Sequence, residues 1–193
     1  MDDKNYKVVF LGEHGVGKTS LINRYINKNF NNNELSTISS TYICKTIEYE
    51  GKKYTFNLWD TAGTEAFRAL TKLFLKDSNI IVLVYDITIK RTFLELQFWL
   101  DYILETFGQK LFLVLVGNKS DLNNLIKIKK SDGEKFGKII NAPFIQVSAK
   151  NGDIEWINFL DNVLKEYLKK TVSKKDDDNE YDYIEDDDSF QFS

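Results

Sequence analysis

The sequence of 193 residues contains only one cysteine, one proline, one methionine and one histidine. Because Cys44 is alone, no disulfide can form within the chain, which is typical of proteins from a reducing compartment. No apolar run is long enough to cross a membrane, and the charged first residues lack the pattern of a secretory signal. We therefore expect a cytoplasmic protein that is long enough to form a core without disulfides.

Charge is distributed unevenly along the sequence. The formal net charge is −3, but residues 171–193 hold nine acidic and two basic side chains, which leaves 24 basic and 20 acidic ones in residues 1–170. So acidic a segment buries too little apolar surface to offset its ordering entropy. We therefore predict one folded domain in residues 1–170 and a disordered tail in residues 171–193. Nucleic-acid binding is disfavoured, because the tail repels phosphates and no basic stripe stands out.

Residues 12–19, GEHGVGKT, match the phosphate-binding pattern G-x-x-x-x-G-K-[ST] between an apolar strand pattern and an amphipathic helix pattern. The glycines let backbone N–H groups face an anion at the positive end of the helix. Lys18 would contact the β- and γ-phosphates, and the Thr19 hydroxyl would bind Mg²⁺. A glycine-rich turn without a ligand is the alternative, but it gives the Lys-Thr pair no purpose. The predicted phosphate contacts are Glu13, His14, Gly15, Val16, Gly17, Lys18, Thr19 and Ser20.

Asp60 is a second candidate, because it ends an apolar strand pattern in Trp-Asp-Thr-Ala-Gly, residues 59–63. Its carboxylate can hold the hydration shell of Mg²⁺, and Gly63 can direct its backbone N–H to a γ-phosphate. Taken alone, Asp60 is as well explained as a helix cap. The phosphate loop earlier in the chain favours the metal site.

Asn-Lys-Ser-Asp at residues 118–121 follows another apolar run and predicts a base-binding element. The Asp121 carboxylate can accept two N–H bonds from the N1 and N2 edge of guanine, which adenine lacks, so the pattern indicates guanine specificity. Ser-Ala-Lys at residues 148–150 would close the pocket with a backbone N–H to the base oxygen. An ordinary polar turn is the alternative, and its place after the right strand argues against it. The predicted base contacts are Asn118, Lys119, Asp121, Ser148, Ala149 and Lys150.

Strand and helix periods alternate along residues 1–170, which predicts an α/β fold with a doubly wound sheet. We expect six mostly parallel strands, one antiparallel strand in a hairpin at Glu50-Gly51, and five flanking helices. The ligand of such a sheet lies beyond the carboxyl ends of its strands. Strands are expected at 7–11, 43–49, 54–59, 80–85, 111–116 and 144–147, and helices from residue 18, around 93–107, at 131–140 and at 153–170.

Together these motifs resemble the Ras superfamily of small GTPases over residues 6–170, whose fold is the small G domain of the P-loop NTPases. The Rab family is the most similar part of it, through residues 45–48 (Lys-Thr-Ile-Glu), 59–63 and 83–88 (Leu-Val-Tyr-Asp-Ile-Thr). The resemblance implies a molecular switch that binds GTP or GDP with Mg²⁺, hydrolyses GTP, and acts in vesicle-mediated intracellular protein transport.

The resemblance also implies roles for single residues. Phe30 is expected to pack edge-on against the guanine, and Lys119 to lie over its face. Thr37 is expected to bind Mg²⁺ only while a γ-phosphate is present, so that loss of this group releases the segments around Thr37 and Gly63. The implied metal ligands are Thr19, Thr37 and Asp60, and the implied catalytic residues are Lys18, Thr37, Gly63 and Thr64.

Tyr42, Trp59 and Phe74 fall where Rab proteins carry an aromatic triad that contacts effectors. The alternative is that these are ordinary core aromatics. The resemblance further implies an exchange factor and a GTPase-activating protein as partners of a monomeric protein.

Several residues depart from the family pattern. Thr64 replaces the glutamine that orients the attacking water, so we expect slow intrinsic hydrolysis or an activator that supplies a glutamine. His14 occupies a position where relatives carry a small residue; it either crowds an activator's arginine or sits near phosphate when protonated, or simply points to solvent. Residues 39–41 (Ser-Ser-Thr) and Ala66 alter surfaces that partners contact.

The final residues 190–193 contain no cysteine, and Asp2 is incompatible with myristoylation, so we expect no lipid anchor and membrane recruitment only through a partner. A slowly cycling switch is the first hypothesis for the function. A GTP-bound scaffold that barely hydrolyses is the second, on the strength of Thr64. A P-loop ATPase or kinase is the third, and Asp121 argues against it.

Overall fold

The computed structural model of the protein describes residues 4–31, 37, 41–61, 74–107, 111–152 and 154–178. Six strands form one sheet in the order β2-β3-β1-β4-β5-β6. All neighbours pair in parallel except β2, which is antiparallel to β3. The predicted six-stranded α/β sheet with one antiparallel strand is therefore confirmed. The strands are β1 (Asn5–Leu11), β2 (Thr41–Tyr49), β3 (Lys52–Asp60), β4 (Ile80–Asp86), β5 (Phe112–Asn118) and β6 (Phe144–Gln146).

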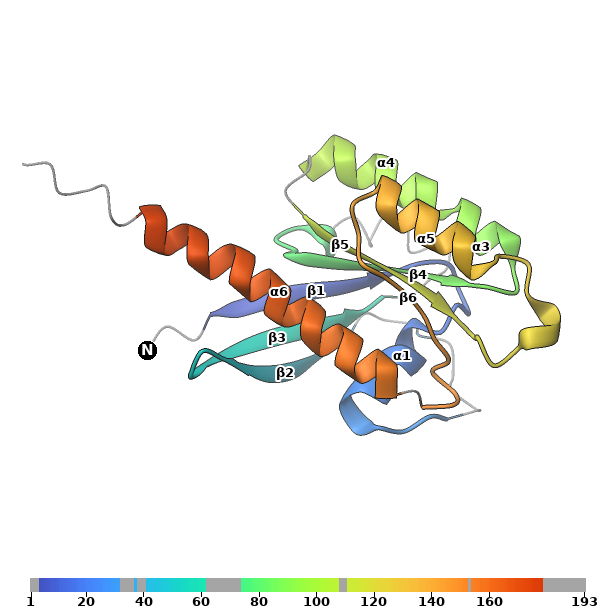
Figure 1. Ribbon diagram of the computed structural model, residues 1–193, viewed down its shortest axis with the longest axis horizontal. Helices are drawn as coiled ribbons and strands as arrows, with labels where there is room; N and C mark the ends of the chain where they lie inside the picture. The colour runs from blue at the N-terminus through green and yellow to red at the C-terminus, as the bar shows by residue number, and fades with distance from the viewer. Residues whose placement is uncertain are drawn as a thin grey trace, which may run out of the picture.

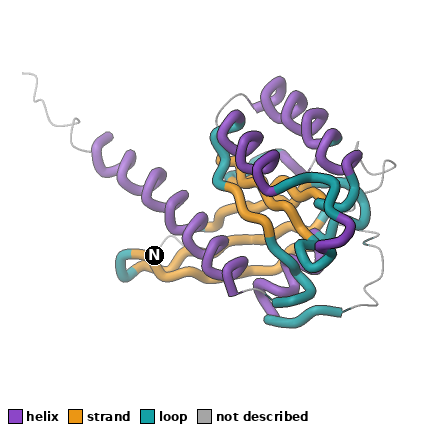
Figure 2. The backbone as a smooth tube through the Cα atoms, turned by 45° about the vertical axis from the view of Figure 1, so that its right-hand side comes forward, coloured by secondary structure: helices purple, strands orange, loops and turns teal. Residues whose placement is uncertain are grey.

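Helices cover both faces of the sheet, as Figures 1 and 2 show from two directions. α1 and α6 pack on one face, and α4 and α5 on the other. The helices are α1 (Lys18–Asn27), α3 (Lys90–Leu94), α4 (Leu96–Phe107), the 3₁₀ turn η3 (Asn123–Leu125), α5 (Lys130–Ile139) and α6 (Ile154–Asp178). Among the described residues, no helix has the length and apolar character needed to span a bilayer.

Alternate side chains of the central strand β1 enter two separate core clusters. Phe10 belongs to the larger cluster, where its ring meets Trp156 of α6 edge-on at a centroid distance of 6.4 Å. Leu11 belongs to the other cluster together with Leu100 of α4. Both faces of the sheet are thus buried, which explains why β1 and β4 are continuous apolar runs.

Two helices differ from the sequence-based expectation. The helical pattern around residues 93–107 is divided into α3 and α4 at Glu95. The last helix continues to Asp178 instead of ending at residue 170. Val172 packs against the larger core cluster and Thr171 Oγ1 donates to Tyr167 O, so the helix still has a packed face beyond residue 170. Residues 179–193 lie outside the described residues, and the boundary at residue 170 stays a prediction.

Candidate functional site

A pocket of about 400 Å³ brings the predicted motifs together from the carboxyl-end loops of the sheet. It is bordered by the loop after β1, the start of α1, the loop after β5 and the loop after β6. Its lining residues are His14, Gly15, Gly17, Lys18, Thr19, Ser20, Phe30, Asn31, Thr37, Thr61, Asn118, Lys119, Asp121, Leu122, Ala149 and Lys150. Among the described residues, four predicted site residues do not line the pocket, namely Glu13, Val16, Asp60 and Ser148, and the last three are buried.

The loop between β1 and α1 depends on two close backbone approaches. Gly12 has φ +151°, and a Cβ there would lie 2.1 Å from the backbone oxygen of Val84. Gly17 has φ +96°, and a Cβ there would lie 2.2 Å from Asn118 Nδ2. No side chain fits either position, so the glycines hold the loop against β4 and the end of β5.

Lys18 is the buried cation of this loop. Only 5% of the residue is exposed, and its Nζ donates to the backbone oxygens of Gly12 and Glu13 at 3.0 Å each. Burial lowers the pKa of Lys18 to about 8, although the Asp60 and Glu13 carboxylates oppose the shift. An ammonium held this way favours an anion in the pocket.

Oxygen atoms of three residues converge beside Lys18. Thr19 Oγ1 donates to Asp60 Oδ2 at 2.6 Å, and the Thr37 hydroxyl lies 2.8 Å from Thr19 Oγ1 and 3.3 Å from the same carboxylate oxygen. Asp60 is 7% exposed at the end of β3. Two hydroxyls and a carboxylate are hard oxygen donors of the kind that suits a small divalent cation.

The opposite end of the pocket is built around Asn118. Its side chain links two loops, because Nδ2 donates to Val16 O at 2.8 Å and Oδ1 accepts from the Ala149 N–H at 3.1 Å. The neighbouring Lys119 forms an ion pair with the buried Asp86 at 2.7 Å. These bonds join the ends of β4, β5 and β6 to the phosphate-binding loop.

Asp121 is oriented by a hydroxyl from the next loop. Ser148 Oγ donates to Asp121 Oδ1 at 2.6 Å and accepts from the Asn151 N–H at 3.1 Å. Ser148 is 1% exposed, so it supports the carboxylate from behind the pocket wall. The arrangement presents an acceptor group to a ligand whose edge carries N–H donors.

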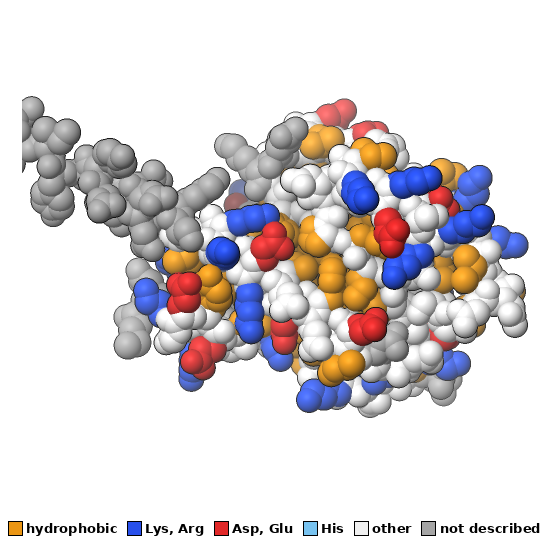
Figure 3. Space-filling view, in the orientation of Figure 1, with side chains coloured by type: hydrophobic (Ala, Val, Ile, Leu, Met, Phe, Trp, Pro, Cys, Tyr) orange, Lys and Arg blue, Asp and Glu red, His pale blue; other side chains and the backbone are white. Residues whose placement is uncertain are grey.

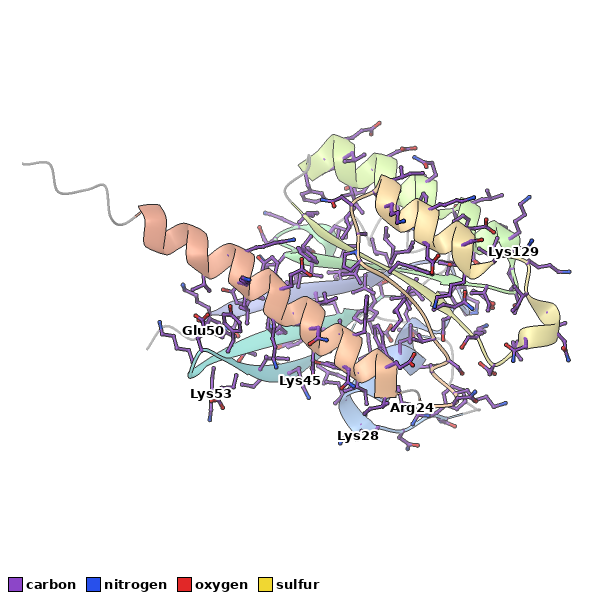
Figure 4. The ribbon with its side chains drawn as sticks, viewed as in Figure 1. Arg24, Lys28, Lys45, Glu50, Lys53 and Lys129 are labelled. Carbon is purple, nitrogen blue, oxygen red and sulfur yellow. The ribbon has the colours of Figure 1, made fainter. Side chains whose placement is uncertain are left out.

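Arg24 is a site residue that the sequence motifs missed. Its Nε donates to Ala149 O at 2.8 Å and its Nη2 to Lys150 O at 2.9 Å, while Nη1 donates to Lys28 O at 2.9 Å. Figure 4 shows Arg24 beside the N-terminal end of α6. No motif signals these contacts, because Ala149 and Lys150 lie 125 and 126 positions after Arg24 in the sequence.

Arg91 is a second residue that the motifs missed. Its Nη2 and Nε donate to Glu13 Oε2 at 2.7 and 3.2 Å, so α3 holds the phosphate-binding loop from outside. The Glu13 side chain is 11% exposed and its backbone oxygen accepts from Lys18. The ion pair therefore balances a carboxylate that lies within a loop built for anions.

The remaining predicted positions are placed unevenly. His14 is exposed at the pocket rim, and Phe30 is half-buried against the larger core cluster while lining the pocket. Gly63 and Thr64, and likewise Ser39, Ser40 and Ala66, lie outside the described residues.

A family model supplies the identity that this geometry suggests. The model of the Ras family matches residues 7–171, which is well over half of the chain. The match covers the sheet except for the first two residues of β1, and it includes every residue that lines the pocket. The chain therefore belongs to the Ras family, whose members are small GTPases that bind guanine nucleotides.

Proposed function

We propose that this small GTPase is a Rab-type switch with a Mg²⁺-dependent GTP state and slow hydrolysis. The observation that carries the proposal is the meeting of Thr37 with Thr19 and Asp60, at 2.8 and 3.3 Å. Thr37 is 18 positions away from Thr19 and 23 from Asp60, so the contact joins an otherwise separate segment to the phosphate end of the pocket. A segment held through the hydroxyl of Thr37 can respond to the nucleotide.

The donor set fits magnesium. Thr19, Thr37 and Asp60 would hold the ion, whose charge when bound offsets that of the β- and γ-phosphates. Lys18 adds a second cation from the buried side of the loop. Gly63 would direct its backbone N–H to the γ-phosphate, so that residues 29–42 and 63–77 form the two nucleotide-sensitive segments.

The base end supports guanine as the ligand. Asp121, oriented by Ser148, would accept from N1 and N2 of the base. Lys119 and Phe30 would contact the ring. The Ala149 N–H, which donates to Asn118 Oδ1 at 3.1 Å, would donate to the base oxygen when the base is bound.

The variant Thr37→Ala tests the switch. Loss of the hydroxyl should weaken Mg²⁺-dependent binding of a non-hydrolysable GTP analogue by roughly tenfold and leave GDP affinity nearly unchanged, since only the triphosphate state uses Thr37. Titrations of both nucleotides with and without Mg²⁺ provide the comparison. Equal losses for GTP analogue and GDP would show that Thr37 supports the fold of the pocket and does not sense the γ-phosphate.

Slow hydrolysis is proposed because Thr64 is too short to orient water as a glutamine does. Thr64→Gln should raise the single-turnover rate of pure protein. A GTP-bound scaffold is the competing function that the same threonine favours. Nucleotide content after purification, followed over hours, separates them: conversion to GDP supports the switch, and stable GTP supports the scaffold.

An aromatic row supports contact with an effector protein. Tyr42 stacks on Trp59 with a centroid distance of 5.0 Å, and Trp59 contacts Phe74 at 5.8 Å. Tyr42 is 54% exposed, although Trp59 also packs against a core cluster. The row thus has an outer face that a partner can bury.

Capture of partners by the GTP-analogue form but not the GDP form tests this surface and its role in vesicle-mediated transport. Tyr42→Ala should abolish nucleotide-dependent capture. Leu104→Ala, which changes an exposed side chain on α4, is the matched control and should not. Cytoplasmic location, with recruitment to endomembranes by a partner, is part of the same proposal.

A further inference from the structure

The short loop between η3 and α5 exposes apolar and basic side chains together. We call residues 125–130 the basic tip. Leu125 is 56% and Ile126 39% exposed, and Lys127, Lys129 and Lys130 are exposed beside them. In Figure 1 this part of the chain projects from the body of the molecule at the right. Two large aliphatic side chains on a projecting loop favour an interaction surface.

The exposure of the basic tip follows from how the loop is fixed. The N–H groups of Lys127 and Ile128 both donate to Ile87 O, at 2.8 and 3.0 Å, and the Leu125 N–H donates to Leu122 O at 2.9 Å. Ile128 is 5% exposed and belongs to a core cluster. The loop is therefore anchored at Ile128, and this anchoring leaves the side chains of Leu125 and Ile126 outside the core.

Further positive charge surrounds the basic tip. Lys90 of α3 and Lys135 and Lys138 of α5 are exposed, and Figure 3 shows Lys and Arg side chains gathered over this end of the molecule. The acidic groups among them are Asp132, whose carboxylate accepts from the Lys129 N–H at 3.1 Å, and the exposed Glu134. Six lysines near two carboxylates leave the surface positive.

The basic tip is remote from the C-terminal end of α6 and from the aromatic row. Figures 1 and 2 show the C-terminal end of α6 on the opposite side of the molecule from η3. Tyr42 and Trp59 lie on β2 and β3, at the other edge of the sheet from β5 and β6. A surface bound to the tip would therefore lie away from the C-terminal end of α6 and would not cover the aromatic row.

We propose that the basic tip docks weakly on an anionic lipid surface, which departs from the sequence-based expectation that the protein reaches membranes only through a partner. Leu125 and Ile126 enter the headgroup region, while Lys127, Lys129 and Lys130 contact lipid phosphates. A lipid surface fits better than a protein partner, because the tip exposes two aliphatic side chains directly beside three lysines. This combination matches a headgroup region, where apolar and anionic groups lie together. The contact is weak and depends on salt, since its attraction is mostly electrostatic.

Flotation of the GDP-loaded full chain with vesicles tests the proposal. Binding should appear with phosphatidylcholine vesicles that contain phosphatidylserine, fall at high salt, and be absent with phosphatidylcholine alone. The triple change Lys127→Glu, Lys129→Glu and Lys130→Glu should reduce binding about tenfold or more. The matched control, Lys52→Glu, Lys53→Glu and Lys165→Glu, has the same charge change on exposed lysines at β3 and α6 and should retain it.

One further variant tests whether the aliphatic side chains insert into the lipid, and a measurement of GDP affinity tests whether the variants fold. Leu125→Ser with Ile126→Ser keeps the charge and should lower vesicle binding severalfold. GDP affinity should be unchanged in all these variants, because glutamate at the start of α5 is compatible with the helix dipole and no changed residue lines the pocket.

Three outcomes would overturn the proposal. One is the absence of phosphatidylserine-dependent binding, and another is an equal loss in both triple variants, which would indicate unspecific attraction. The third is a tip that binds an acidic peptide such as polyglutamate but no vesicle, which would assign the surface to a protein partner.

Discussion

The base end and the phosphate end of the nucleotide pocket are built in different ways. At the base end, each polar group is tied to a separate element: Asn118 to Val16 and Ala149, and Asp121 to Ser148. These bonds need no ligand, and they fix the acceptor groups before a base arrives.

At the phosphate end, the groups proposed to meet the phosphates and the cation bond to their own loop or to one another. Lys18 donates to backbone oxygens five and six residues away, and Thr19, Thr37 and Asp60 share a cluster of hydroxyl and carboxylate oxygens. Such bonds can be exchanged for bonds to an anion and its cation. We therefore expect selectivity for the base to be a fixed property of the pocket, and contact with the phosphates to change with the nucleotide.

The largest effect should come from the phosphate end. Lys18→Ala removes a buried cation, so GDP affinity should fall at least about 100-fold, or close to 3 kcal/mol. Fluorescence titration with labelled GDP measures this affinity, and Lys165→Ala, which changes an exposed side chain of α6, is the control. A loss below tenfold would mean that the backbone N–H groups alone hold the phosphates.

At the base end, Asp121→Asn should weaken GDP binding roughly 30-fold, about 2 kcal/mol, because an amide cannot accept both N–H bonds. The same variant should gain affinity for xanthosine diphosphate, whose C2 carbonyl matches the amide donor. Competition between the two nucleotides gives the readout. Ser148→Ala should have a smaller effect, since it only orients the carboxylate; an unchanged preference in Asp121→Asn would refute the base assignment.

A smaller effect should follow from Arg24→Ala, which cuts the bonds from α1 to Ala149 O and Lys150 O. We expect GDP to dissociate about tenfold faster, because the loop over the base is no longer held. Arg24→Lys keeps the positive charge but loses the planar set of guanidinium N–H donors, so it separates the effect of geometry from that of charge. Equal dissociation rates for Arg24→Lys and wild type would assign the effect to charge alone.

The smallest effect should be a pH dependence of the phosphate end. Without nucleotide, the pKa of Lys18 is lowered to about 8. Bound phosphates raise this pKa, so nucleotide binding is coupled to uptake of a proton by Lys18 above about pH 8. GDP affinity should fall roughly fourfold from about pH 7 to about pH 8.5 and be nearly constant below pH 7. Ser148→Ala, at the base end, should keep this slope; a flat profile in wild type would contradict the titration of Lys18.

Local pattern was enough for most of the fold. β4 is buried along all seven residues, and its continuous apolar sequence already required cover on both faces. The end of α6 was missed by eight residues, because the charged segment after residue 170 gives no sign that Val172 packs on the core. The division at Glu95 was missed as well, since the apolar period runs through it.

The placement of the phosphate loop, Asp60, Asn118 and Asp121 at neighbouring strand ends was predictable, because each motif lies at a fixed distance from a strand pattern. Their roles in binding stay predictions. The Ras family match agrees with this pattern, while the Rab character stays a proposal. The anchoring arginines were not predictable: on a sequence, Arg24 and Arg91 are ordinary helix charges.

The sequence by itself therefore determined the alternation of strands and helices and the motifs at the strand ends, since both depend on neighbours within a few residues. Only the tertiary structure decided that Arg91 meets Glu13 across 78 positions, that Arg24 meets Ala149 across 125, and that Gly17 must lack a side chain because Asn118 lies against it. These contacts depend on the order of the strands in the sheet, and that order is set by the packing of the whole domain.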